Sequence, residues 1–301
     1  MSDEPSDVES NFTDDEQTLE TKNTKDKNSL FQKLLVIAAS SDRGQFASKT
    51  QKEELQLLIR QIEESSSGEA APTTSQKMIG TWELLYSDTQ LFRSSPFFMA
   101  GRAVCTTSEQ AEQYDWFCGM HRAALAISEI GKVRQIVSDS RIISEFETKV
   151  GAIPFLSDFT PFKYSGGLPF TIEGAIVSSA DITPVNDGRS WEIFMDQVEI
   201  KGSNIPLLRR VLDDERVSLK SRDLGKVLEE NVSGYSNPKP IFDTTYLDDN
   251  FRISRDQDGK VFVYGKTSDS TDPTEYKDVE SDLGVLKLLE GLNDNFFKIS
   301  I

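Results

Sequence analysis

The chain has 301 residues, of which 37% are hydrophobic and 28% are charged, a composition ordinary for a globular protein. Its formal net charge of −17 has the wrong sign for neutralising phosphates, so nucleic acid is not an expected partner. No apolar run approaches the roughly 20 residues needed to cross a bilayer, and two cysteines are too few for a disulfide framework. A single bridge between Cys105 and Cys118 remains open.

Residues 1–28 predict a disordered acidic tail. They carry nine acids and three lysines and almost no apolar side chains. Such a segment buries too little surface to offset the entropy lost on ordering.

Residues 29–64 predict a helical hairpin. Apolar residues recur at helical spacing in both halves, and Thr50 and Glu53 have the spacing of a capping box for the second helix. The apolar faces comprise Leu30, Leu34 and Ile37, then Leu55, Leu58, Ile59 and Ile62. Residues 65–76, SSSGEAAPTTSQ, have the composition of a linker.

Residues 77–301 read as a mainly β domain. In SWEIFMDQVEIKG, Trp191, Ile193 and Met195 alternate with other residues, and the apolar positions change parity after Asp196, as a β-bulge would require. RQIVSDSRIISEFETKV predicts two strands about a Ser-Asp-Ser turn, and LPFTIEGAIVSSADITPV a strand or a pair broken at Gly174. KVFVYGK reads as the closing strand.

Many strands with short connections favour an antiparallel barrel or sandwich. SDLGVLKLLEGL predicts a C-terminal helix beside it. Two segments, about 99–122 and 151–169, are expected to be loop insertions.

Three stretches carry a family resemblance: IGTWELLYSDTQLFRSSPFF from Ile79, VRQIVSDSRIISEF from Val133, and TYLDDNFRISRDQDGKVFVY from Thr245. Together with the preceding helical hairpin, they resemble the plastid lipid-associated proteins, or plastid fibrillins. The resemblance covers most of residues 29–266. It implies a lipocalin-like antiparallel β-barrel that binds or organises lipids without catalysis.

The spacing of Gly80 and Trp82 is that of lipocalins, in which the indole closes the barrel floor beneath an arginine from a late strand. Arg252 or Arg255 could be that arginine here, paired with Asp248 or Asp249. The alternative is that these acids only hydrate an exposed turn. If the barrel holds a ligand, we expect Trp191, Ile193 and Met195 to face it.

Motifs for other chemistry are missing from the sequence. His121 is the only histidine and has no nucleophile motif around it, so no catalytic residues are expected. Asp256 to Gly259 lacks the glutamate that would complete a calcium loop, and no Cys/His metal cluster or cofactor fingerprint occurs. We therefore expect neither an enzyme nor a cofactor.

Three functions stay open: a carrier of isoprenoid or acyl lipids such as prenyl quinones or carotenoids, a coat on lipid droplets, and a protein-interaction module of the photosynthetic membrane without a ligand. Two apolar loops are candidate membrane or partner contacts, and their alternative is to fold back as plugs over the barrel ends. Their key residues are Phe97, Phe98 and Met99, and Phe155 and Phe159.

The resemblance also implies a plastid location, in the chloroplast at thylakoids or plastoglobules. No targeting segment is visible, because MSDEPSDVESNFTDDEQ is acidic whereas transit peptides are basic and rich in serine. We expect the complete precursor to carry an additional basic presequence.

Overall fold

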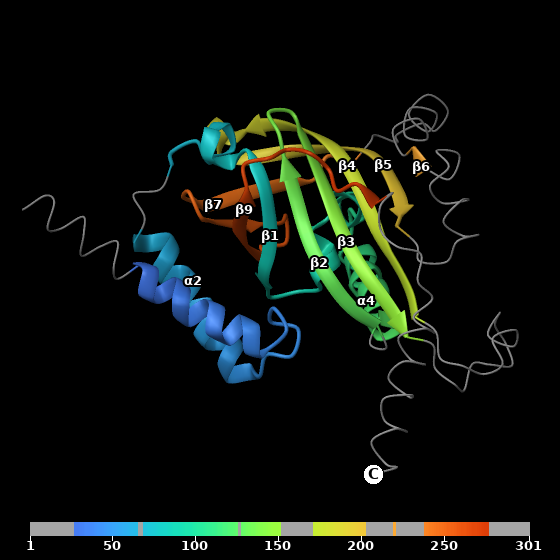
Figure 1. The fold of residues 1–301 in the computed structure, drawn as a ribbon, viewed down its shortest axis with the longest axis horizontal. Coiled ribbons are helices and arrows are strands. Elements are labelled where there is room, and N and C mark those ends of the chain that lie inside the picture. The colour runs from blue at the N-terminus through green and yellow to red at the C-terminus, as the bar shows by residue number, and fades with distance from the viewer. Residues whose placement is uncertain are drawn as a thin grey trace, which may run out of the picture.

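The structure is a computed structural model that describes residues 27–65, 69–125, 128–151, 171–202, 219–220 and 238–276. Its centre is a β-barrel with helices on one side and inside (Figure 1). The expected acidic tail except for residues 27 and 28, the loop at 151–169 except for residue 151, and the C-terminal helix lie outside the described residues. Residues 27 and 28 were expected in the tail but begin the first helix. No helix in the described part of the chain is long and apolar enough to span a membrane.

Eight antiparallel strands close the barrel. In chain order they are β1 (Gly80–Ser87), β2 (Ser128–Val137), β3 (Arg141–Gly151), β4 (Thr171–Val185), β5 (Ser190–Lys201), β7 (Ile241–Leu247), β8 (Phe251–Arg255) and β9 (Val261–Ser268). Each strand pairs with the next, and β9 pairs back with β1. The two-residue β6 (Leu219–Lys220) pairs with the middle of β5. The predicted lipocalin-like barrel is thus confirmed.

Several local predictions hold in the strands. The β4–β5 pairing skips Asp196, because Ser179 pairs with Gln197 and Ala180 with Met195, so the predicted bulge is present. The Ser-Asp-Ser turn joins β2 to β3. Of the two alternatives for LPFTIEGAIVSSADITPV, the single strand forms, since β4 runs through Gly174, which pairs with Thr148.

The helical hairpin packs on the outer surface of the barrel (Figure 1). Its helices occupy residues 27–40 and α2 (Lys49–Ser65). The capping box lies two residues before the predicted one: Ser48 Oγ accepts a hydrogen bond from Gln51 N, and Gln51 Oε1 accepts one from Ser48 N. Ser48 with Gln51 and Thr50 with Glu53 both fit the capping-box pattern, and the structure forms the first of the two.

Two further helices, α3 (Pro96–Ala103) and α4 (Ser108–Leu125), follow the 3₁₀ turn η3 (Leu91–Ser94). They occupy the segment expected to be a loop insertion, so that expectation was wrong about its structure. α3 contacts β4 and β5, whereas α4 contacts β2. Because β2 and β5 lie well apart in the barrel order, the two helices extend across the barrel. Shorter 3₁₀ turns are η1 (Pro72–Thr74), η2 (Gln76–Met78) and η6 (Asn186–Gly188).

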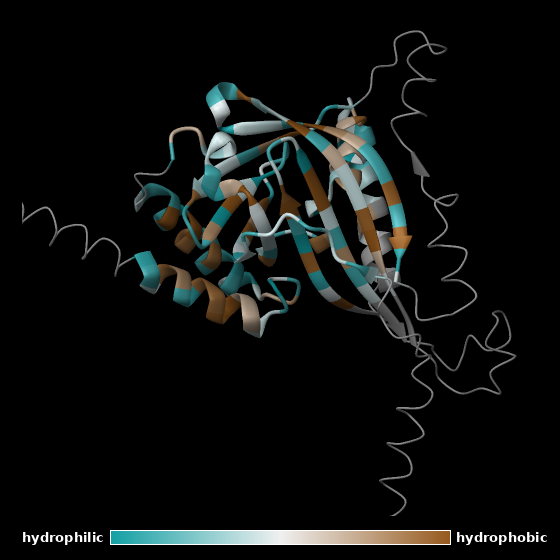
Figure 2. Cartoon of the chain, turned by 45° about the horizontal axis from the view of Figure 1, so that its top comes forward, coloured by the Kyte–Doolittle hydropathy of each residue, from teal (hydrophilic) through white to brown (hydrophobic). Residues whose placement is uncertain are grey.

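The apolar side chains form two main clusters, one inside the barrel and one beneath the hairpin. The interior cluster joins inward residues of the strands to side chains from η3, α3 and α4. The outer cluster joins the buried faces of the hairpin helices to Tyr86, Tyr246, Ile253 and Val263. Figure 2 shows the corresponding alternation of hydrophobic and hydrophilic residues along the long strands. The barrel therefore has a packed inner face and, on one side, a covered outer face.

Candidate functional site

The first part of the site is the start of β1, where Trp82 is buried and β9 lies close to Gly80. Trp82 is fully buried, and its Nε1 donates a hydrogen bond to the carbonyl oxygen of Met78 at 2.8 Å. Gly80 precedes it with a φ of 131°, and a Cβ there would lie 2.5 Å from the carbonyl oxygen of Ser268. Only glycine permits that approach of β9 to β1. Barrel closure therefore requires a glycine at position 80, and it places the indole of Trp82 two residues later inside the barrel.

Arg252 extends from β8 into the barrel and is completely buried. Its guanidinium carbon lies 4.1 Å from the ring centre of Tyr264, 5.2 Å from that of Trp82 and 5.8 Å from that of Trp191. Nη2 donates to Gln135 Oε1, and Nη1 lies 3.5 Å from the sulfur of Met78. Of the two arginines considered for a place against Trp82, the structure puts Arg252 there. Arg255 lies outside the barrel, where it binds Glu63 of α2 at 3.0 Å.

The buried cation lacks a carboxylate partner among the described residues. Burial lowers the pKa of Arg252 to about 10, so the group stays charged at neutral pH. Its Nε and the hydroxyl of Tyr264 are both buried without a hydrogen-bond partner in the described part of the chain. Burial also raises the pKa of Tyr264, which keeps that hydroxyl protonated. The polar side chains of Arg252 and Ser94 partly oppose that rise, so the Tyr264 hydroxyl has polar neighbours, and Arg252 Nε is the donor left to meet an acceptor.

Asp248 does not pair with an arginine among the described residues. Its carboxylate accepts hydrogen bonds from the backbone of Asn250 and Phe251 and from the Tyr246 hydroxyl, and it lies 3.4 Å from Lys27 Nζ. Burial alone would raise the pKa of Asp248, but these hydrogen bonds lower it. Asp248 therefore shapes the β7–β8 turn and joins it to the hairpin, while Asp249 lies 3.7 Å from Lys77.

The segment from η3 to α4 places side chains inside the barrel. Phe92, Phe98, Met99 and Cys118 all belong to the interior cluster. Phe98 and Met99 are thus buried, as in the alternative in which this loop folds back as a plug. Three apolar side chains stay exposed: Phe97 of α3 at 39%, Val104 just after α3 at 48% and Trp116 of α4 at 67%. The other predicted contact residues, Phe155 and Phe159, lie outside the described residues.

A buried ion cluster fastens this segment to the β8–β9 turn. Arg93 of η3 is 3% exposed and contacts Asp115 at 2.9 Å, Asp258 at 3.0 Å and Asp256 at 3.5 Å. Arg102 of α3 also contacts Asp258, at 2.7 Å. Burial raises the pKa of Asp256, which the backbone of Lys260 and the charge of Arg93 partly oppose. The β8–β9 turn, Asp256 to Gly259, was compared with a calcium loop from its sequence. In the structure its two aspartates bind Arg93 of η3 and Arg102 of α3, and Arg93 in turn binds Asp115 of α4.

The expected ligand-facing residues lie on the inner face of β5. Trp191 and Ile193 belong to the interior cluster, and Met195 is also buried. Their contact with a ligand stays a prediction. Sequence reasoning missed Gln135, Tyr264 and Arg93, because each is a polar or amphipathic residue whose partner is distant in the sequence.

Comparison with known proteins completes the description. The model of the PAP_fibrillin family matches residues 28–115 and 123–265, well over half of the chain. The chain belongs to the PAP_fibrillin family, the plastid lipid-associated proteins. Searches of curated proteins and of solved structures gave no match.

Membership of the PAP_fibrillin family agrees with the closed barrel. Its proteins are generally lipid-associated and non-enzymatic, and they belong to plastids. The family match leaves out only residues 116–122 between its two parts, a stretch inside α4. The part of this chain that departs from the family pattern is therefore shorter than the 99–122 insertion predicted from the sequence.

Proposed function

We propose that this protein associates with thylakoid or plastoglobule surfaces and organises isoprenoid or acyl lipids there without catalysis, using the exposed faces of α3 and α4. The observation that carries the proposal is the exposure of Phe97 and Trp116 on these two helices. Family membership supplies the lipid association in general.

The chemistry of these side chains suits a lipid interface. Large apolar side chains exposed on neighbouring elements often mark a lipid or protein contact, and the indole of a tryptophan prefers the boundary between water and lipid. Burying each aromatic side chain is worth roughly 1.5 to 3 kcal/mol. The net charge of −17 opposes approach to anionic lipid, and salt weakens that repulsion over a Debye length of about 8 to 10 Å.

Flotation with liposomes that contain anionic lipid tests the proposal. We expect binding of the full chain to strengthen as salt is raised, and Phe97→Ser with Trp116→Ser to reduce it without lowering the melting temperature. Phe46→Ser is a matched control, because Phe46 is 77% exposed but lies in the turn of the helical hairpin. Binding that falls steeply with salt, or an equal loss in the control, would contradict docking through α3 and α4.

A second candidate function, a lipid carrier, is favoured by the unmatched Nε donor of Arg252 inside the barrel. A lipid with a carbonyl or carboxyl oxygen, such as a prenyl quinone or a fatty acid, would supply the missing acceptor inside the barrel. Because η3, α3 and α4 occupy the interior here, such a ligand requires part of that segment to move. Mass spectrometry of an organic extract of the native protein decides this: a stoichiometric oxygen-bearing lipid supports the carrier, and a pure hydrocarbon or no ligand argues against it.

A further inference from the structure

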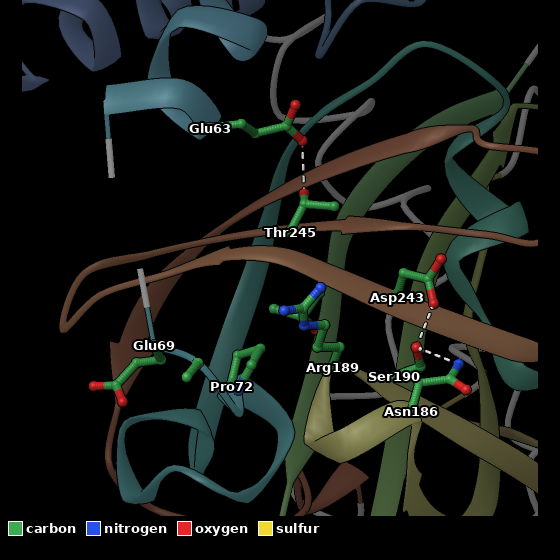
Figure 3. Close-up of a pocket in the computed structure, with 10 residues that line it drawn as sticks. Glu63, Glu69, Pro72, Asn186, Arg189, Ser190, Asp243 and Thr245 are labelled. Atoms are coloured by element: carbon green, nitrogen blue, oxygen red, sulfur yellow. Dashed lines mark hydrogen bonds between the residues drawn. The ribbon is translucent and has the colours of Figure 1, made fainter. Parts of the chain in front are cut away.

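A pocket of about 550 Å³ lies outside the barrel, away from the interior cluster and from α3 and α4. Three parts of the chain enclose it: the end of α2 with residues 69–72, the β4–β5 turn, and β7 (Figure 3). Its volume is within the range of small-molecule sites. Some polar groups that line the pocket have no hydrogen-bond or ion-pair partner among the described residues, so they are available to a ligand.

The walls of the pocket are held in place. Thr73 Oγ1 donates to the carbonyl oxygen of Gly188 at 2.7 Å, which fastens the linker to the β4–β5 turn. At Gly188 the φ is 75°, and a Cβ would lie 2.8 Å from that of Ala71. Asn186 and Asp187, just before it, also have positive φ, at 51° and 55°. Such strained backbone persists only where surrounding contacts fix it, so the turn presents its side chains in one arrangement.

Two of the three carboxylates in the pocket are already neutralised. Glu63 accepts hydrogen bonds from Arg255 and from Thr245 Oγ1. Glu69 lies 3.4 Å from Lys77 Nζ. Neither carboxylate therefore makes the pocket a site for a cation.

The remaining charges, Arg189 and Asp243, are not paired with each other. Asp243 Oδ1 accepts from Ser190 Oγ at 2.5 Å, and Ser190 in turn accepts from Asn186 Nδ2 at 3.0 Å. Asp243 Oδ2 has no hydrogen-bond partner in the described part of the chain. The side chain of Arg189 is exposed and makes no ion pair or hydrogen bond to any described residue, although it extends into a pocket with acidic walls (Figure 3).

The pocket thus offers both hydrogen-bond donors and acceptors, with balanced charge. The guanidinium of Arg189 and the amide of Asn186 donate, whereas the carboxylate of Asp243 accepts. An anion would meet the carboxylate of Asp243 and the −17 charge of the chain, and a cation would meet Arg189. A sugar hydroxyl both donates and accepts, so adjacent hydroxyls match such a set, and the ring of Pro72 gives a face for C–H groups.

We propose that this pocket binds a neutral polyhydroxylated group, namely a sugar, either free in solution or as the headgroup of a glycolipid. Arg189 is the main donor and Asp243 the main acceptor. The pocket is independent of the lipid contact through α3 and α4.

Saturation-transfer NMR on the full chain tests the proposal with methyl β-galactoside and methyl α-glucoside as probes. We expect at least one of them to bind, and Arg189→Met to weaken binding about tenfold or more, because it removes charge-assisted hydrogen bonds. Arg60→Met is the matched control: Arg60 is an exposed arginine on α2 that makes no ion pair with a described residue. The variant with Phe97→Ser and Trp116→Ser should bind the sugar as the wild type does.

Vesicles separate the two sources of the sugar. Stronger flotation with phosphatidylcholine vesicles that carry a glycosyldiacylglycerol than with phosphatidylcholine alone, lost in Arg189→Met, assigns the site to a headgroup. Binding of the methyl glycosides without that difference assigns it to a free sugar. Absence of binding by every sugar probe, or tighter binding of inorganic phosphate than of the glycosides at the same pocket, would overturn the proposal.

Discussion

Replacing Arg93 by methionine should destabilise the protein by about 3 kcal/mol, the lower end of the range for breaking a buried ion pair. Arg93 is 3% exposed and holds three carboxylates. Of these, Asp115 is mostly exposed and Asp258 keeps its contact with Arg102 at 2.7 Å. The main penalty is therefore the buried Asp256, which is 7% exposed and would lose its nearest cation.

The penalty should also depend on pH. Burial already holds the pKa of Asp256 above its ordinary value, so the folded state binds this proton more tightly than the unfolded state. Stability from this group is then greatest at acid pH and falls as pH rises through the raised pKa. Removing Arg93 raises that pKa further. The difference between wild type and variant should thus be large at neutral pH and shrink toward pH 4.

Urea unfolding at several pH values measures the effect, with Arg252→Met as the comparison. Arg252 is equally buried but has no carboxylate partner among the described residues, so its removal strands only the acceptor oxygen of Gln135, at about 1 to 3 kcal/mol. If Arg252→Met costs more than Arg93→Met, or if the cost of Arg93→Met does not change with pH, stranded charge is not the reason for the loss.

Two further predictions concern α2 and the two cysteines. Glu63→Gln should weaken the contact of α2 with Arg255 and cost no more than about 1 kcal/mol, because this pair is partly exposed; hydrogen exchange should rise in α2 and not in β2. Cys105 and Cys118 are free thiols, so reductant should leave the melting temperature unchanged in the wild type and in Cys105→Ser alike. Iodoacetamide should react first with Cys105, since Cys118 is buried and burial raises its pKa; a reductant-sensitive melting temperature would instead reveal a bridge.

The strand pattern could be predicted from the sequence because its signals are local. Alternation along β5 and the change of parity at Asp196 depend on neighbouring residues alone, and the bulge appears where the pattern changes. The capping box was placed two residues late because Ser48 with Gln51 and Thr50 with Glu53 fit the same pattern. Sequence spacing cannot choose between such overlapping alternatives.

The helices α3 and α4 could not be predicted because their sequences show no clear helical stripe of apolar residues. Contacts with other parts of the protein stabilise them instead. The inward face of α4 carries Tyr114 and Cys118 rather than a row of large aliphatic residues. Tyr114 donates its hydroxyl to the carbonyl oxygen of Phe98 and stacks its ring near Arg93, 5.2 Å away. Each of these partners lies outside the helix, so a search for helical stripes does not find it.

The polar residues of the stretch from Thr244 to Lys266 serve several different parts of the fold, which explains their number. Side chains alternate across β8, so Arg252 points into the barrel while Arg255 points out toward α2. Before β8, Asp248 fixes the turn; after it, Asp256 and Asp258 hold η3 and α3 through two arginines. The three strands β7, β8 and β9 with their two turns therefore contact the barrel interior, the outer helices and the segment that fills the barrel. If a lipid enters the barrel and moves that segment, the ion pairs of Asp256 and Asp258 with Arg93 and Arg102 must change.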